Sequence, residues 1–325
     1  MKRILAILLF LAICVAMSFA NGAQEGAKPA YPTKPITLIV GAKAGGGTDN
    51  LVRLIAPGLE KTLGQKINIV NKVGGSGTMG NLEVSNSAAD GYTIGVLTDF
   101  ETIGNLLSGA DLGYNKDTIK FIGSINASTN ILIVGAKFPG EKTVKGFVEY
   151  CKQNPGSVTI GTSAAAQRMV MQSLADAAGI KFTCVPFSGG PESFNNLLGG
   201  QVDASFIAPS FSAQAIANGC TPIACASYER FSLLPELPSF KESGFNTINN
   251  ETTRIFFAPK DTPDYIIEIL EKALKDATSS EDIKASLAKI NEMYSYKTAA
   301  EARSSFEDKF ASIKAVVDAN PSILK

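Results

Sequence analysis

The stretch from Ile36 to Asp49, which reads ITLIVGAKAGGGTD, constrains the fold of this chain more than any other. Residues 36–40 are rich in β-branched apolar side chains, as in a parallel strand that is buried on both faces. Three consecutive glycines then interrupt any regular element, and an amphipathic segment follows from Leu51. The order predicts a strand, a tight loop and a helix.

We interpret this loop as a binding site for an anion. Consecutive glycines let the backbone come close to a ligand and leave its N–H groups pointing outward. We expect the helix to begin near Asn50 and to be capped by Thr48 or Asp49, so that the positive end of its dipole adds to the site. Asp49 fits a cap better than a contact with an anion. The candidate residues of this loop are Lys43, Ala44, Gly45, Gly46, Gly47, Thr48 and Asp49.

Residues 1–20 have the pattern of a cleaved secretory signal peptide. Lys2 and Arg3 precede an apolar core, and Ser18 and Ala20 supply small residues before the cleavage point. Cys14 follows Ile13 within the apolar core, so we expect no lipid anchor. We therefore predict an exported, periplasmic or extracytoplasmic protein that begins with a linker over residues 21–30.

The composition of the mature chain excludes several classes of function. Removing Lys2 and Arg3 leaves 28 basic against 30 acidic residues, a net charge of −2, which argues against nucleic acid as a partner. Histidine is absent, which excludes catalytic triads and histidine-ligated zinc, and we expect no catalysis, metal or cofactor. The remaining cysteines are expected to be mostly buried thiols: Cys151, Cys184, Cys220 and Cys225.

Short alternating strand and helix patterns predict an α/β fold with two lobes. About 305 mature residues are enough for two domains. Two β-prone segments, 120–134 and 254–259, are suited to cross between them. We predict one lobe from residues 31–123 plus 254–325 and a second from residues 124–253. After residue 259 we expect two amphipathic helices.

The second glycine loop offers a competing interpretation. Residues 75–80 read GSGTMG, satisfy the G-x-G-x-x-G pattern, and are followed by Asp99 about 20 residues later, as in a dinucleotide-binding site. An exported oxidoreductase is therefore the alternative function. The leader, the missing histidine and the rival cradle at Gly45–Gly47 weigh against it.

Several segments together resemble the tripartite tricarboxylate transporter solute receptors, also called the Bug family. They include YPTKPITLIV, GAKAGGGTD, LGQKINIVNKVGGSGTMG, ADGYTIGVLT, VPFSGG and LLGGQVDA, and they extend over nearly the whole mature chain. The resemblance implies a two-domain periplasmic-binding-protein fold of the Venus flytrap, type II-like kind with two hinge crossings. It also implies delivery of an organic carboxylate to a separate membrane permease.

By this resemblance, loops from both lobes form the ligand site. In the first lobe they add Gly75, Ser76, Thr78, Thr98 and Asp99 to the loop Lys43–Asp49. In the second lobe they comprise Thr162, Ser163, Ala164 and Asp203. We add Phe187, which either stacks against a ligand or closes the core, and Arg168, where this sequence departs from the family. Arg168 stands where many relatives have histidine, and we hypothesise that it pairs with a second carboxylate.

Some questions stay open at this point. Phe100 and Glu101 are expected at the wall of the cleft, where Glu101 would disfavour a tricarboxylate unless it is turned outward. The identity of the carboxylate is not predicted. We expect a monomer, and a sensor kinase is an alternative to the permease as its partner.

Overall fold

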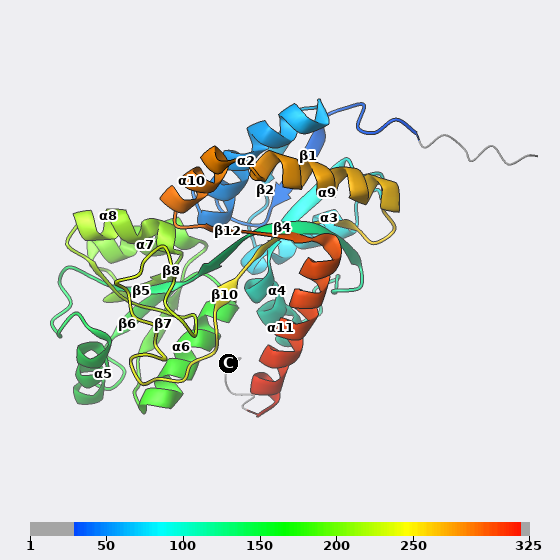
Figure 1. Cartoon of the computed structure of the whole chain (residues 1–325). Coiled ribbons are helices and arrows are strands. Elements are labelled where there is room, and N and C mark those ends of the chain that lie inside the picture. Colours follow the sequence, from blue (N-terminus) through cyan, green and yellow to red (C-terminus); the bar gives the residue numbers. More distant parts are fainter. Residues whose placement is uncertain (1–28, 320–325) are drawn as a thin grey trace, which may run out of the picture. The chain divides into compact units, whose positions relative to one another are not determined.

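The computed structural model describes residues 29–319. The predicted signal peptide and most of the linker therefore lie outside the described residues. Contacts divide the chain into two units, Met1–Thr33 and Lys34–Lys325. The described part of the first unit, residues 29–33, contains no helix or strand, so all elements below belong to the second unit (Figure 1).

The first sheet has seven strands in the order β10-β4-β11-β3-β1-β2, with β12 paired to β4. Its strands are β1 Ile36–Val40, β2 Ile67–Asn71, β3 Thr93–Thr98, β4 Ile119–Thr129, β10 Glu251–Thr252, β11 Arg254–Pro259 and β12 Met293–Thr298. Strands β1, β2 and β3 are parallel, with Ile36 opposite Ile67 and Thr37 opposite Thr93. Their carboxyl ends, and the loops that follow them, therefore meet at one edge.

The second sheet has five strands in the order β7-β6-β8-β5-β9. Its strands are β5 Ile131–Val134, β6 Thr159–Thr162, β7 Thr183–Pro186, β8 Ala204–Ile207 and β9 Thr221–Cys225. Strands β6, β7 and β8 are parallel, whereas β5 runs antiparallel to β8 and β9. The loops after β6, β7 and β8 again share one edge.

The chain passes from the first sheet to the second at Asn130, the single residue between β4 and β5. It returns after β9 through a long connection that reaches β10. The amide of Asn130 donates to Oδ1 of Asn250 at 2.8 Å, and the amide of Asn250 donates to the carbonyl of Ala226 at 2.9 Å. Hydrogen bonds thus tie the two crossings together. The predicted lobe boundaries stay a prediction.

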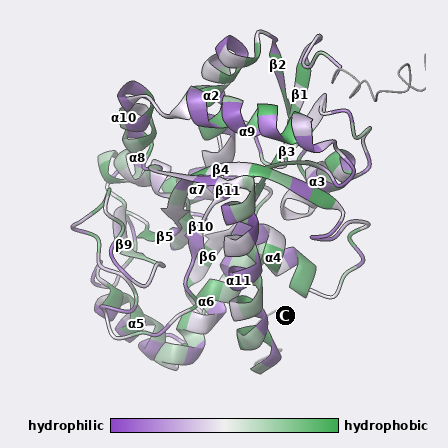
Figure 2. Ribbon diagram, turned by 45° about the vertical axis from the view of Figure 1, so that its right-hand side comes forward, coloured by the Kyte–Doolittle hydropathy of each residue, from purple (hydrophilic) through white to green (hydrophobic). Residues whose placement is uncertain are grey.

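Helices cover both sheets, and hydrophilic and hydrophobic residues alternate along them (Figure 2). They are α2 Gly47–Leu63, α3 Thr78–Ser85, α4 Asp99–Leu107, α5 Val144–Gln153, α6 Ala165–Ala178, α7 Gly190–Gly199, α8 Ser212–Ala217, α9 Asp264–Thr278, α10 Glu281–Lys289 and α11 Ala299–Ala319. In α2, Leu51, Val52 and Ile55 are buried while Arg53 is exposed, as expected for a helix with one face on a sheet.

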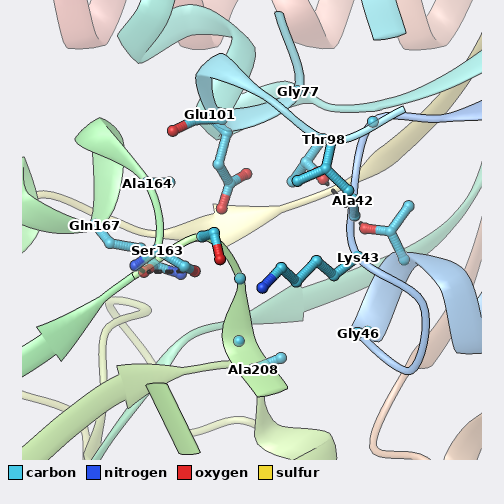
Figure 3. A pocket seen from close by; sticks show the side chains of 18 of the residues that line it. Ala42, Lys43, Gly46, Gly77, Thr98, Glu101, Ser163, Ala164, Gln167 and Ala208 are labelled. Atoms are coloured by element: carbon cyan, nitrogen blue, oxygen red, sulfur yellow. Dashed lines mark hydrogen bonds between the residues drawn. The ribbon is translucent and has the colours of Figure 1, made fainter. Parts of the chain in front are cut away.

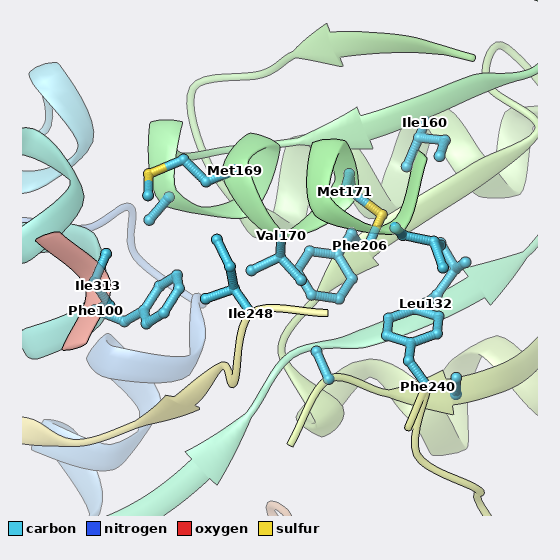
Figure 4. Close-up of a cluster of buried hydrophobic side chains, with 14 of the residues drawn as sticks. Phe100, Leu132, Ile160, Met169, Val170, Met171, Phe206, Phe240, Ile248 and Ile313 are labelled. Carbon is cyan, nitrogen blue, oxygen red and sulfur yellow. The ribbon is translucent and has the colours of Figure 1, made fainter. Parts of the chain in front are cut away.

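The main hydrophobic core contains residues of both sheets and of helices α4, α6 and α11 (Figure 4). Phe100 of α4, Val170 of α6 and Ile313 of α11 are all buried in it. Helices α4 and α6 approach closely, because a Cβ added to Gly104 would lie 2.9 Å from the Cβ of Ala166. This contact joins α4, which follows β3 of the first sheet, to α6, which follows β6 of the second sheet.

The structure corrects several expectations. Helix α4 was not predicted, and Phe100 lies in the core rather than at the cleft wall. After residue 259 there are three helices and the antiparallel strand β12, not two helices, because α10 and β12 are short and weakly patterned. The cysteine prediction is confirmed: Cys151, Cys220 and Cys225 are buried free thiols and Cys184 is half-buried. None of the helices in residues 29–319 is long and apolar enough to cross a bilayer.

Candidate functional site

A cavity of about 390 Å³ is lined by loops of both sheets (Figure 3). This is a suitable volume for a small molecule. Of the residues predicted for the site, it brings together Lys43, Gly46, Gly47, Thr48, Gly75, Ser76, Thr98, Ser163, Ala164, Arg168 and Phe187. The remaining predicted residues do not line it: Ala44, Gly45, Asp49, Thr78, Asp99, Thr162 and Asp203.

The first loop presents backbone amides at the start of α2. The helix begins at Gly47, with Gly46 as its N-cap and no side-chain cap, so the predicted start near Asn50 and the predicted cap at Thr48 or Asp49 are wrong. Gly47 and Thr48 lie in the first turn of the helix, where backbone N–H groups have no acceptor inside the helix. Within residues 29–319 we find no other acceptor for these two amides. Both residues line the cavity. Two helix N–H groups are therefore available to an anion there.

Asp49 shapes this loop from behind. Its Oδ2 accepts hydrogen bonds from the amide of Gly45 at 2.8 Å and from Nε of Arg53 at 2.9 Å, and its Oδ1 accepts one from Nδ2 of Asn71 at 2.9 Å. Burial opposes ionisation of this carboxyl, but the hydrogen bonds from Arg53, Gly45 and Asn71 outweigh it and lower its pKa. Asp49 is thus a charged anchor of the glycine loop, with its carboxylate turned away from the cavity.

The second loop adopts left-handed backbone conformations in three consecutive residues. Gly75, Ser76 and Gly77 have φ values of 54°, 52° and 94°. Such a run turns successive N–H groups into one concavity, and no acceptor in the described chain is found for the amides of Gly75 and Ser76. Nδ2 of Asn105 holds the carbonyls of Gly75 and Ser76 at 3.1 Å each. A second cradle of amides therefore faces the cavity.

The two glycine loops lie directly against each other. A Cβ on Gly41 would be 2.9 Å from Cα of Gly77, and a Cβ on Gly80 would be 3.0 Å from Cα of Gly41. The glycines of the GSGTMG pattern therefore have a packing reason to be present. Asp99, which a dinucleotide site would use for the ribose, is buried and accepts hydrogen bonds from the amide of Thr253 at 2.8 Å and from Lys309. Asp99 is the first residue of α4, and these hydrogen bonds leave it unavailable to a ribose.

The second sheet contributes the loop after β6, which contains Ser163, and the turn before β8, which contains Asp203. Oε1 of Gln167 accepts hydrogen bonds from the amide of Ser163 at 2.7 Å and from its hydroxyl at 3.2 Å, so both donors of this residue are engaged and its hydroxyl oxygen can still accept. Thr162 is fully buried. Asp203 accepts both the amide and the hydroxyl of Thr159 at 2.8 Å and thereby links β6 to the turn before β8. Asp203 and Thr162 support the loops from outside the cavity.

Charged side chains surround the cavity in a specific pattern. Lys43 of the first loop pairs with Glu192 of α7 at 3.1 Å and so connects the two sheets. Hydrogen bonds from Ser188 and the ion pair with Lys43 lower the pKa of Glu192 to about 2. Arg254 of β11 pairs with Glu292 at 2.7 Å, and their side chains are only 6% and 0% exposed. Arg168 lines the cavity without an ion-pair partner among the described residues.

Glu101 lies at the wall of the cavity, as expected, although it was not among the residues predicted to bind the ligand. Its side chain points into the cavity, in the direction of Ser163 (Figure 3), so it is not turned outward. Its Oε2 is buried and has no hydrogen-bond partner in the part of the chain that the structure describes. Burial raises the pKa of Glu101 to about 7. Asn130 was missed: it lines the cavity from the crossing segment, and its Nδ2 is buried without a hydrogen-bond partner among residues 29–319. A prediction of α4 would have placed Glu101 in its first turn.

The described residues contain no group of three or more histidine, cysteine, aspartate or glutamate side chains placed to hold a metal ion. The cavity instead combines amides, hydroxyls and a few charged groups. Such a set can replace the water around a small anion.

Comparisons with known proteins identify the family of this chain and solved structures with the same fold. Residues 51–320 match the family described as tripartite tricarboxylate transporter family receptor. The chain is 34% identical over 261 residues to the UPF0065 protein in the TAR-I ttuE-ttuC' intergenic region of Agrobacterium vitis, which covers 77% of this chain and 73% of that relative. A solved periplasmic transporter matches with a TM-score of 0.85 and 27% identity over 91% of this chain and 100% of its own. R. palustris Rpa4515, solved with adipate, matches with a TM-score of 0.84 and 26% identity over 89% and 98%.

Proposed function

Since the chain belongs to the tripartite tricarboxylate transporter receptor family, we propose that it captures a small organic carboxylate outside the cytoplasm and delivers it to a membrane permease of that transporter type. The observation that carries the proposal is the pair of glycine loops, which direct unpaired amides into a cavity shared by both sheets. The adipate bound to Rpa4515 supports a carboxylate as the ligand.

The amides of Gly47, Thr48, Gly75 and Ser76 are the proposed donors to one carboxylate. They come from two loops in contact, and the dipole of α2 adds positive potential at the same point. Hydrogen bonds to a charged acceptor are stronger than those between neutral groups, so a cradle without a cationic side chain is sufficient. The carboxylate is recognised here, whatever group is attached to it.

Arg168 is the proposed partner of a second negatively charged group. It begins the second turn of α6 on the opposite side of the cavity, and its guanidinium can bind a carboxylate through two hydrogen bonds. A ligand that contacts both Arg168 and the glycine loops joins the two sheets. Because such a ligand binds the closed arrangement better than an open one, it favours closure.

We infer that the protein binds its ligand without converting it. The sequence has no histidine, and the carboxylate that accepts the hydroxyl of Ser188 at the cavity wall, Glu192, has a pKa lowered to about 2 and is therefore a weak base. A monomer exported by a cleaved signal peptide fits the proposed role. The exported oxidoreductase loses its support because Asp99 is engaged with Thr253 and Lys309.

A thermal-shift screen of organic acids, followed by calorimetry on the strongest binder, tests the proposed function. We expect Gly46→Val to abolish the shift, because a Cβ at this buried position already lies 3.1 Å from the carbonyl of Lys43 and 3.9 Å from Cδ of Pro191. The branched side chain would stand in the cradle. Ala44→Val is the matched control, since Ala44 belongs to the same loop but is exposed and outside the cavity.

The control is expected to keep the wild-type shift. If the wild-type protein responds to no carboxylate, the proposed function is wrong. If Gly46→Val, still folded, responds as strongly as the wild type, the first loop is not the binding site.

A further inference from the structure

Glu101 is an unusual residue for a site that binds anions. It is the third residue of α4, directly after the carboxyl end of β3. It points into the cavity, and its Oε2 is buried without a partner in the described chain (Figure 3). A buried carboxylate oxygen without a hydrogen bond is costly, and the cost falls when a donor arrives. The cavity therefore contains an acceptor that the protein itself leaves unused.

The other charges that line the cavity show which donor would fit. The positive charge of Lys43 is balanced by Glu192, and that of Arg254 by Glu292. Among the described residues, Arg168 and Glu101 then remain as the lining cation and the lining acid that form no ion pair. A ligand complementary to this pair carries both signs of charge.

We propose that Glu101 binds a positively charged nitrogen of the ligand, so that the captured molecule is an amino-carboxylate. This inference rests on the proposed function, because it takes the carboxylate cradle as given. It assigns to Glu101 a role in specificity: an ammonium group donates to Oε2, while a second carboxylate at that position is repelled.

The competing interpretation is that Glu101 is protonated and donates to a second carboxylate of the ligand. Burial favours the neutral acid, as does the nearby Asp99, whereas Arg254 and Lys309 favour the carboxylate. The two interpretations differ in the ligand they select. An ammonium stabilises the ionised form of Glu101, whereas a dicarboxylate requires the neutral form.

Calorimetry at pH 8 with matched ligands separates them. Aspartate is compared with succinate and glutamate with glutarate, since each pair differs only in an amino group. The strongest binder from the organic-acid screen is compared in the same way with its amino-substituted or amino-free counterpart. We expect the wild-type protein to prefer the amino-carboxylate of the best-binding pair by about tenfold or more.

Glu101→Gln keeps the shape of the side chain and removes its charge. We expect this variant to lose most of the preference while still binding carboxylates. Glu149→Gln makes the same chemical change at an exposed position of α5 and is expected to keep the preference.

A wild-type protein that binds carboxylates without preferring the amino form overturns the inference and leaves the proposed function standing. A preference that survives in Glu101→Gln also overturns it. A wild-type protein that binds none of these compounds, with or without an amino group, contradicts the proposed function itself.

Discussion

Single residues in this protein differ sharply in how far the sequence reveals their role. Asp49 was predicted to favour a structural role, and it indeed anchors the glycine loop, although through Arg53, Asn71 and the amide of Gly45 rather than as the cap. Glu101 was noticed in the sequence, but its burial depends on α4 and on the loop at Ser163 across the cavity. A sequence does not show which carboxylate is left without a partner when distant segments pack.

Glu101 makes the stability of the ligand-free protein depend on pH. Burial raises its pKa from 4.5 to about 7, while Arg254, Asp99 and Lys309 exert smaller effects. Below pH 4.5 the group is protonated in both folded and unfolded chains and costs nothing. As the pH rises from about 4.5 to about 7, Glu101 ionises in the unfolded chain but stays protonated in the folded chain, so the folded protein loses stability; above pH 7 both ionise and the loss levels off.

We therefore expect Glu101→Gln to be more stable than the wild type at pH 8, by about 1–3 kcal/mol, and nearly equal to it at pH 4.5. Urea denaturation at the two pH values measures the difference. Equal differences at both pH values would show that folding does not shift the pKa of Glu101.

At the scale of elements, the strand, loop and helix around Gly45–Gly47 were predicted well because local pattern determines them. Strand β1 has the predicted bounds, and α2 ends at Gly64, whose φ of 66° is a conformation that glycine adopts readily. The start of α2 was misplaced by about three residues because the cap is made by backbone at Gly46 and not by a side chain. The contact between the loops, at Gly41 and Gly77, was beyond prediction because it joins separate βα units.

The ion pair between Lys43 and Glu192 links the first glycine loop to α7 of the second sheet. We expect Glu192→Gln to speed ligand dissociation by about two- to fivefold at low salt, because the pair is partly exposed and such pairs are weak. Stopped-flow or surface-binding kinetics measures this rate.

Glu83→Gln is the matched control for Glu192→Gln. Glu83 pairs with Lys72 at 3.0 Å and with similar exposure, but this pair joins α3 to the residue that follows β2, both on the first sheet. Dissociation should be unchanged in this variant. If both variants behave alike, Lys43 and Glu192 do not hold the two sheets together around the ligand.

At the scale of the molecule, the α/β class and the two-lobed fold followed from the sequence and the family resemblance, whereas the predicted lobe boundaries stay a prediction. The antiparallel strands could not be predicted from the sequence. Strand β11 pairs with β3 and β4, and β12 pairs with β4, across separations of more than 100 residues. Alternation within a strand indicates burial but does not name a distant partner, so the mixed sheets could be learned only from the structure.

The central claim is that backbone amides of two glycine loops, together with groups from the second sheet, hold a carboxylate in one shared cavity. A crystal structure of the protein with the strongest binder of the organic-acid screen tests it most directly. We predict a carboxylate within hydrogen-bond distance of the amides of Gly47, Thr48, Gly75 and Ser76. We also predict that another group of the ligand contacts Arg168 or Glu101. A ligand bound elsewhere, or bound in this cavity without contact to either glycine loop, would contradict it.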